Sequence, residues 1–78
     1  MAHLEPKEVL ARNLRRIRTS TGLSQEGLAA RSGLHRTYIS SVERGQRNVS
    51  VENIFAIARA LGCDPQALID ARSAEGDG

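Results

Sequence analysis

The stretch HRTYISSVERGQRN, residues 35–48, places three arginines and several short hydroxyl side chains on one segment. A guanidinium group can donate two parallel hydrogen bonds to a phosphate or to the edge of a purine base, and hydroxyl groups can donate or accept beside it. The spacing of Ile39 and Val42 predicts a helix over residues 36–44 that buries these two side chains and turns its polar residues outward. The chemistry available to this segment is therefore the binding of an anion by an exposed helix.

The basic residues are concentrated in one part of the chain. The 78 residues carry a net charge of +2, yet residues 12–47 hold eight basic and two acidic residues, a net charge of +6, and the remainder carries −4. This asymmetry predicts an anionic partner, with nucleic acid as the leading candidate. A solvated, salt-bridged surface is the alternative that charge alone leaves open. Four arginines of the first two predicted helices could either solvate the helix surface or attract DNA over a long range, and the sequence leaves both roles equally open. These residues are Arg12, Arg15, Arg16 and Arg31.

Length and composition restrict the architecture and the location. A chain of 78 residues forms one small domain, and 40% apolar with 26% charged residues is typical of a soluble globular protein. The single cysteine, Cys63, excludes an intrachain disulfide and suits a reducing compartment. The sequence contains neither an apolar stretch of membrane-spanning length nor a signal-peptide core, so we expect a cytoplasmic protein without membrane association.

Apolar spacing and capping residues predict five helices, and no segment alternates as a strand does, so the predicted fold is all-α. Four of the helices begin at a proline or after a capping residue, and most of the five end near a glycine. The predicted helices are Pro6 up to Gly22, the Ser24 cap to Gly33, Arg36 to Arg44, Val51 to Leu61, and Pro65 to about Ala71. We expect a single domain over residues 1–78, folded from about residue 6 to 71. Residues 72–78 are expected to form a disordered tail because they have little to bury.

The second and third predicted helices have the spacing of a helix-turn-helix. Gln25 opens the pair, Ala29 permits a close approach of the two helices, and Gly33 can adopt the positive φ of a tight turn. Ile39 and Val42 then anchor the third helix in the core. Because the outer face of that helix is cationic, the pattern predicts a recognition helix for the major groove of DNA.

The segment GLSQEGLAARSGLHRTYISSVERGQRNVSVENIFAIARALG, residues 22–62, resembles the Xre/Cro-type helix-turn-helix regulators, which include the lambda-like phage repressors. Within it, HRTYISSVERGQRN is similar to the controller proteins of restriction–modification systems, which are small dimeric regulators of their own operon and of the endonuclease. Gly27 departs from the usual polar residue at its position. The resemblance implies a compact five-helix lambda-repressor-like domain and a sequence-specific transcriptional regulator that binds a pseudo-palindromic operator as a homodimer.

A recognition helix directs its N-terminal residues toward base edges, and Arg36 is the leading candidate for a bidentate contact to guanine O6 and N7. The full set of predicted base contacts is Arg36, Thr37, Ser40, Ser41 and Arg47. Phosphate contacts flank such a helix because they set its register on the duplex. The predicted phosphate contacts are Gln25, His35, Tyr38, Arg44 and Asn48. For Tyr38 the alternative is a ring that covers the edge of the domain.

Two further roles concern the architecture. Arg18 and Glu43 resemble the internal ion pair of the family, which joins the first helix to the end of the third. The fourth helix is apolar over a wider arc than one small core requires, which predicts a dimer interface that continues onto the fifth helix. The alternative is that the apolar face of the fourth helix is completely buried within one monomer. We assign Leu68 of the fifth helix to the core. The predicted interface residues are Ile54, Phe55, Ile57 and Ile69.

Catalytic, metal and cofactor sites are not predicted. His3 and His35 lie far apart without a neighbouring carboxylate or thiolate cluster, and Cys63 has no CxxC partner. We therefore expect no enzyme and no cofactor. The expected partners are duplex DNA, a second copy of the chain and, for activation, RNA polymerase. Two alternatives remain open: a DNA-binding antitoxin whose fourth helix binds another protein, and a protein-interaction adaptor that does not bind DNA.

Overall fold

A computed structural model describes residues 3–76, in which six α-helices occur and no strand. The helices are α1 (Pro6–Ser20), α2 (Gln25–Ser32), α3 (Arg36–Glu43), α4 (Val51–Leu61), α5 (Pro65–Ile69) and α6 (Ala71–Gly76). The predicted all-α class is confirmed. None of the helices in the described part of the chain is long and apolar enough to span a membrane.

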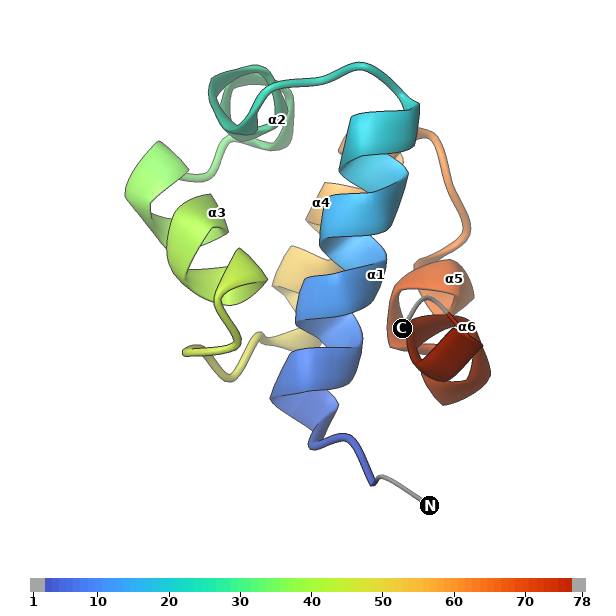
Figure 1. Cartoon of the computed structure of the whole chain (residues 1–78). Helices are drawn as coiled ribbons and strands as arrows, with labels where there is room; N and C mark the ends of the chain where they lie inside the picture. The colour runs from blue at the N-terminus through green and yellow to red at the C-terminus, as the bar shows by residue number, and fades with distance from the viewer. Residues whose placement is uncertain (1–2, 77–78) are drawn as a thin grey trace.

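The long first helix lies at the centre of the fold. Figure 1 shows α1 running through the middle of the molecule, with α2 and α3 on one side, α4 behind it, and α5 and α6 on the other side. α1 contacts α3, α5 and α6, whereas α2 contacts α3 and α4. The arginine-rich segment and the C-terminal pair of helices therefore lie on opposite sides of α1.

Local capping sets the bounds of several helices. The side chains of Ser24, Ser50 and Asp64 each accept a hydrogen bond from a backbone N–H in the first turn of α2, α4 and α5, at 2.9, 3.1 and 2.9 Å. Each bond satisfies one of the amides that a helix start leaves unpaired. α2 and α4 end at Gly33 and Gly62, whose φ values of 77° and 72° lie in the left-handed region that favours glycine. These helix starts and ends were predicted from the sequence and are confirmed.

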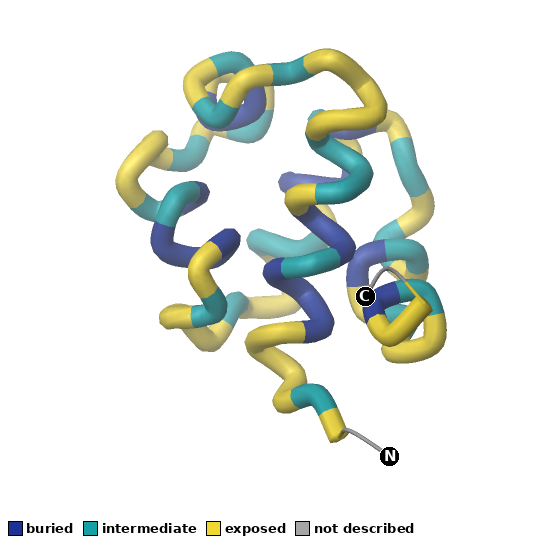
Figure 2. The backbone as a smooth tube through the Cα atoms, viewed as in Figure 1, coloured by how far each residue is buried: buried dark blue, intermediate teal, exposed yellow. Residues whose placement is uncertain are grey.

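The core is aliphatic and forms between the inward faces of the first five helices. Figure 2 shows the buried segments facing one another across the centre of the molecule. The large apolar side chains that are buried almost completely are Leu14, Leu28, Ile39, Val42, Ile57 and Leu68. The predicted burial of Ile39, Val42 and Leu68 is confirmed. The prediction that Ile57 belongs to a dimer interface is wrong, because it shares the inward face of α4 with Ala58 and Leu61 and is fully buried.

The C-terminal segment differs from the prediction of one helix to about Ala71 and a disordered tail beyond it. The helix ends at Ile69, Asp70 adopts an extended backbone with ψ 108°, and α6 begins at the next residue. The Asp70 carboxylate accepts a hydrogen bond from the backbone N–H of Arg72 at 2.9 Å, which caps α6. α6 contacts α1 and buries Ala74 completely. Residues 72–76 are therefore helical, and residues 77–78 lie outside the described part.

Candidate nucleic-acid interface

The outer face of α3 is polar while its inner face is anchored in the core. Ile39 and Val42 are 0% and 1% exposed, whereas Arg36 and Thr37 are exposed and Ser40 is partly exposed. α3 follows the tight turn at the end of α2 and packs against that helix. The first turn of α3 therefore projects from the domain on a firm support, as the helix-turn-helix spacing predicts.

Arg36 forms an exposed ion pair with Glu26 of α2. Its Nε atom lies 4.0 Å from Oε2 of Glu26, and the two side chains are 61% and 77% exposed. Exposed pairs contribute about 0–1 kcal/mol because water and salt screen them, so this contact can be exchanged for a ligand at little cost. His35, directly before α3, is exposed and makes no side-chain capping hydrogen bond.

Ser41 is not on the exposed face, and the prediction that placed it there is wrong. Its side chain is buried; the hydroxyl donates to the backbone oxygen of Tyr38 at 2.8 Å and accepts from Nε of Arg47 at 3.2 Å. The Arg47 guanidinium also lies 5.3 Å from the centre of the Tyr38 ring, a cation–π arrangement. The segment that follows α3 folds back over Ser41, while Arg47 itself remains exposed.

Tyr38 joins α3 to α4. The ring is half-buried and packs against the core, and its hydroxyl accepts a hydrogen bond from Nδ2 of Asn53 at 3.0 Å. This geometry favours the alternative in which the ring covers the edge of the domain. Asn53 was not predicted as a site residue. Its distance from Tyr38 along the sequence does not indicate that the two helices meet at these residues.

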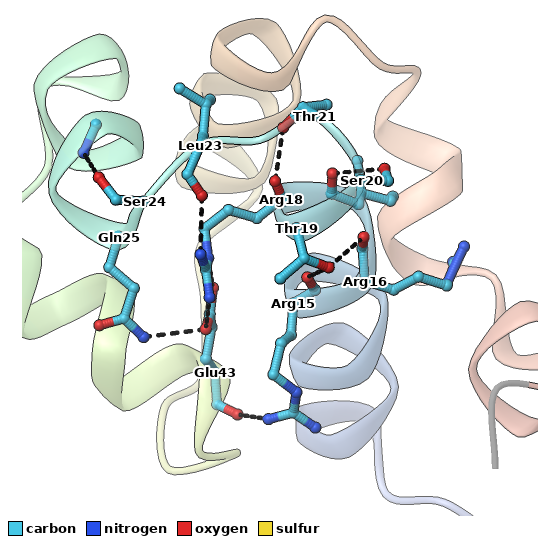
Figure 3. Close-up of polar contacts among 12 residues, drawn as sticks. Arg15, Arg16, Arg18, Thr19, Ser20, Thr21, Leu23, Ser24, Gln25 and Glu43 are labelled. Atoms are coloured by element: carbon cyan, nitrogen blue, oxygen red, sulfur yellow. Dashed lines mark hydrogen bonds and ion pairs between the residues drawn. The ribbon is translucent and has the colours of Figure 1, made fainter.

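A buried ion pair joins α1 to the end of α3. Nε and Nη2 of Arg18 donate to the two carboxylate oxygens of Glu43 at 2.5 and 3.0 Å, and the side chains are 13% and 4% exposed. Figure 3 shows the Arg18 side chain lying between Leu23 and Glu43. These hydrogen bonds, aided by the nearby carboxylate charge, raise the pKa of Arg18, although burial acts in the opposite direction. The predicted pairing of Arg18 with Glu43 is confirmed.

The same carboxylate orients the first residue of α2. Nε2 of Gln25 donates to Oε1 of Glu43 at 3.0 Å, and Nη1 of Arg18 donates to the backbone oxygen of Leu23 at 2.9 Å. Glu43 thus accepts hydrogen bonds from α1 and α2 while it belongs to α3 (Figure 3). Gln25 is held at the N-terminus of α2, where backbone amides and the helix dipole favour a negative group.

Arginines also surround the C-terminal end of α3. Nη1 of Arg15 donates to the backbone oxygen of Glu43 at 3.0 Å, and Nη1 of Arg44 donates to Oγ of Ser40. Arg15 and Arg44, together with Arg12, line a hollow of about 460 Å³ beside this helix end, which Glu8 and Glu43 also line. Asn48 is exposed in the following loop. The polar face of α3 therefore continues into a cationic surface at its C-terminal end.

An apolar surface lies on α4 and α5. Among the described residues the exposed large hydrophobic side chains are Val51, Phe55 and Ile69, which are 67%, 51% and 55% exposed. Ile54 is half-buried against the core, and it lines a hollow of about 190 Å³ together with Ile69. We call these four residues the α4–α5 surface. Val51 is absent from the sequence-based interface, although it precedes Phe55 by one helical turn and so lies on the same side of α4.

Known proteins are similar to this chain in sequence and in fold. Residues 14–68 match the family model HTH_3, helix-turn-helix. Control protein C.SmaI from Serratia marcescens is 48% identical over 66 residues, which cover 85% of this chain and 79% of that protein. The crystal structure of the restriction–modification controller protein C.AhdI from Aeromonas hydrophila is 52% identical, with a TM-score of 0.77 over 80% of this chain and 94% of that one. A crystal structure of the controller protein C.Esp1396I, a tetramer in complex with its natural 35-base-pair operator, has a TM-score of 0.80 and 27% identity over 96% of each chain.

Proposed function

Because this chain belongs to the HTH_3 helix-turn-helix family, we propose that it regulates transcription from a pseudo-palindromic operator that it binds as a homodimer. As a member of this family of DNA-binding regulators, it is not an enzyme. The observation that carries the proposal is the two-sided character of α3, which exposes Arg36 and Thr37 while Ile39 and Val42 anchor it in the core. A helix held in this way can enter the major groove with its outer face while its inner face stays packed in the core.

We propose that α3 reads bases mainly through Arg36, with Thr37 and Ser40 beside it. A bidentate contact from Arg36 to guanine O6 and N7 would provide about 1–3 kcal/mol of discrimination against other bases. A threonine offers a hydroxyl to a base edge and a methyl to thymine. Arg47 can join this set by exchanging its contact with Ser41 for one with DNA, whereas the buried Ser41 is not retained as a base contact.

Phosphate contacts are proposed on both sides of α3. Gln25 lies at the start of α2, and His35 precedes α3, so both can meet one strand of the duplex. Arg44 and Asn48 follow the helix and can meet the other strand. In the hollow beside Arg44, the carboxylates of Glu8 and Glu43 offset part of the positive charge of the three arginines, so no further phosphate is assigned to it. Phosphate contacts give affinity without base specificity and make binding sensitive to salt.

The second copy of the chain is proposed to bind at the α4–α5 surface. Three large apolar side chains exposed on a domain of this size are typical of an interaction surface. To bind two half-sites one duplex turn apart, a two-fold dimer has to place its recognition helices about 34 Å apart, as a pseudo-palindromic operator requires. Phe55 and Ile69 are the central residues of this proposal, and Val51 and Ile54 lie beside them.

The regulated genes are proposed to be a restriction–modification operon, on the basis of the similarity to C.SmaI and C.AhdI over most of their lengths. Such a regulator acts in the cytoplasm, where bacterial DNA lies. Repression follows if the bound dimer occludes a promoter. Activation requires a contact with RNA polymerase, for which Glu52 offers an exposed carboxylate at the start of α4.

Selection of bound duplexes from a random DNA pool tests the proposed function. We expect a two-fold-symmetric motif whose half-sites lie about one duplex turn apart. The affinity for the selected duplex should fall steeply as the salt concentration rises, because bound phosphates release counterions. A pool without an enriched motif, together with binding that does not depend on salt, would contradict DNA reading. Binding to the DNA upstream of its own gene, compared with an unrelated promoter, tests the controller role.

A further inference from the structure

A buried amide on α1 lies at the corner where α5 and α6 meet. Asn13 is fully buried, and its Nδ2 atom donates to the backbone oxygens of Leu68 and Asp70, both at 3.0 Å. Its Oδ1 atom accepts a hydrogen bond from Nη2 of Arg16 at 2.9 Å. Both N–H groups of the amide and its oxygen are therefore paired, which fixes the orientation of the side chain.

The two carbonyl groups that Asn13 binds are those on either side of Ile69. α5 ends at this residue, so the Leu68 carbonyl lies in the last turn, where a helix leaves its carbonyl groups without an intrahelical partner. Asp70 has an extended backbone and caps α6 through its carboxylate. The corner is thus held from α1 by one amide and from α6 by one cap. Figure 1 shows both short helices beside α1.

α5 needs an external support because it has only five residues. A helix of that length is not stable by itself, so its rotation about its own axis depends on tertiary contacts. Leu68 and Ile69 are neighbours of similar size, and a rotation by one residue, about 100°, would turn Ile69 into the core and Leu68 away from it. In the structure Leu68 is 0% exposed and Ile69 is 55% exposed. The hydrogen bonds of Asn13 hold the backbone on both sides of Ile69 in the arrangement that the structure shows.

We propose that Asn13 is a positioning residue for the dimer interface: it sets the α5–α6 corner so that Ile69 projects toward the second copy. This inference rests on the proposed homodimer. Asn13 is fully buried and cannot touch the second copy. Its influence on association therefore passes through the corner, by the orientation of Ile69.

The dimer dissociation constant of Asn13→Leu, measured by sedimentation equilibrium, tests the inference. Leucine keeps a similar volume and removes both donors. We expect the dissociation constant to rise about tenfold, a size typical of coupling between linked sites. Leu28→Val is the matched core control, because Leu28 is fully buried in α2, which contacts α3 and α4. Its dissociation constant should stay that of the wild type. An equal rise in both variants would overturn the inference, since it would show a general effect of lost stability.

A double-mutant cycle separates positioning from simple destabilisation. If Asn13 acts through Ile69, Asn13→Leu should add no further change in an Ile69→Ala background, whereas additive effects would overturn the inference. In hydrogen exchange, the α6 amides of Asn13→Leu should exchange faster than those of the wild type, whereas the amides of α2 and α3 should exchange at unchanged rates. Asn13→Ser, which keeps one donor, replaces Asn13→Leu if the latter does not fold. A wild-type chain that stays monomeric would overturn both the dimer and this inference; a dimer that Asn13→Leu leaves unchanged overturns this inference alone.

Discussion

Removal of the Glu43 carboxylate is the most informative perturbation of the scaffold that supports α3. In Glu43→Ala, Arg18, which is 13% exposed in the wild-type structure, loses its counter-charge, and Gln25 loses an acceptor. Removing one partner of a buried ion pair costs about 3–5 kcal/mol, because the other charge stays buried and unpaired. Whole domains are stable by only about 5–15 kcal/mol, and small domains lie toward the lower end. We therefore expect Glu43→Ala to lose a large part of its free energy of unfolding.

Urea unfolding followed by circular dichroism at pH 7 measures this loss, with the protein concentration held fixed because dimerisation adds to apparent stability. The matched control is Arg18→Met with Glu43→Leu, which removes both charges and keeps their volume. That double variant should unfold at a free energy close to the wild-type value. A cost of less than about 1 kcal/mol for Glu43→Ala would show that the pair behaves as an exposed one. A double variant no more stable than Glu43→Ala would show that the unpaired Arg18 charge is not the cause of the loss.

Three further predictions concern the helix ends and the apolar surface. Ser50→Ala should lower the free energy of urea unfolding by about 0.5–2 kcal/mol because the N-cap bond to Asn53 is lost, and an unchanged midpoint would contradict this. The hydrogen bond from the Arg72 amide lowers the pKa of Asp70 below its ordinary value of 3.8. The contribution of Asp70 to the α6 cap is therefore complete above pH 3.8 and is lost as the pH falls through the lowered pKa. An NMR titration of the Arg72 amide that follows the ordinary value would argue against the cap. Phe55→Glu should raise the dimer dissociation constant in sedimentation equilibrium without changing the circular dichroism spectrum, and an unaltered constant would place the interface elsewhere.

Features that depend on neighbouring residues in the chain were predictable from the sequence. Ser24, Ser50 and Asp64 bond to amides within their own first turns, and Gly33 and Gly62 supply the left-handed backbone at helix ends. Capping acts over two or three residues, so a sequence pattern carries the necessary information. The inward spacing of α3 was predictable for the same reason.

Features that depend on distant segments were not predictable in this way. The break between α5 and α6 is supported by Asn13, which lies 55 positions before Leu68. The angular position of Ser41 suggests an outward side chain, but the returning segment covers it through Arg47. The Arg18–Glu43 pair spans 25 positions and was expected only because the chain resembles a known family. Local spacing contains no signal for such contacts, since they arise only when helices pack.

Affinity for the selected operator, measured base by base, tests whether α3 reads bases through Arg36. Binding of Arg36→Ala and Arg44→Ala is compared with the wild type on operators that carry one base change at each position. We expect Arg36→Ala to lose discrimination at one position in each half-site, whereas Arg44→Ala binds every operator more weakly and depends less on salt. Full discrimination by Arg36→Ala at all positions, or a uniform loss of affinity, would contradict base reading by this residue.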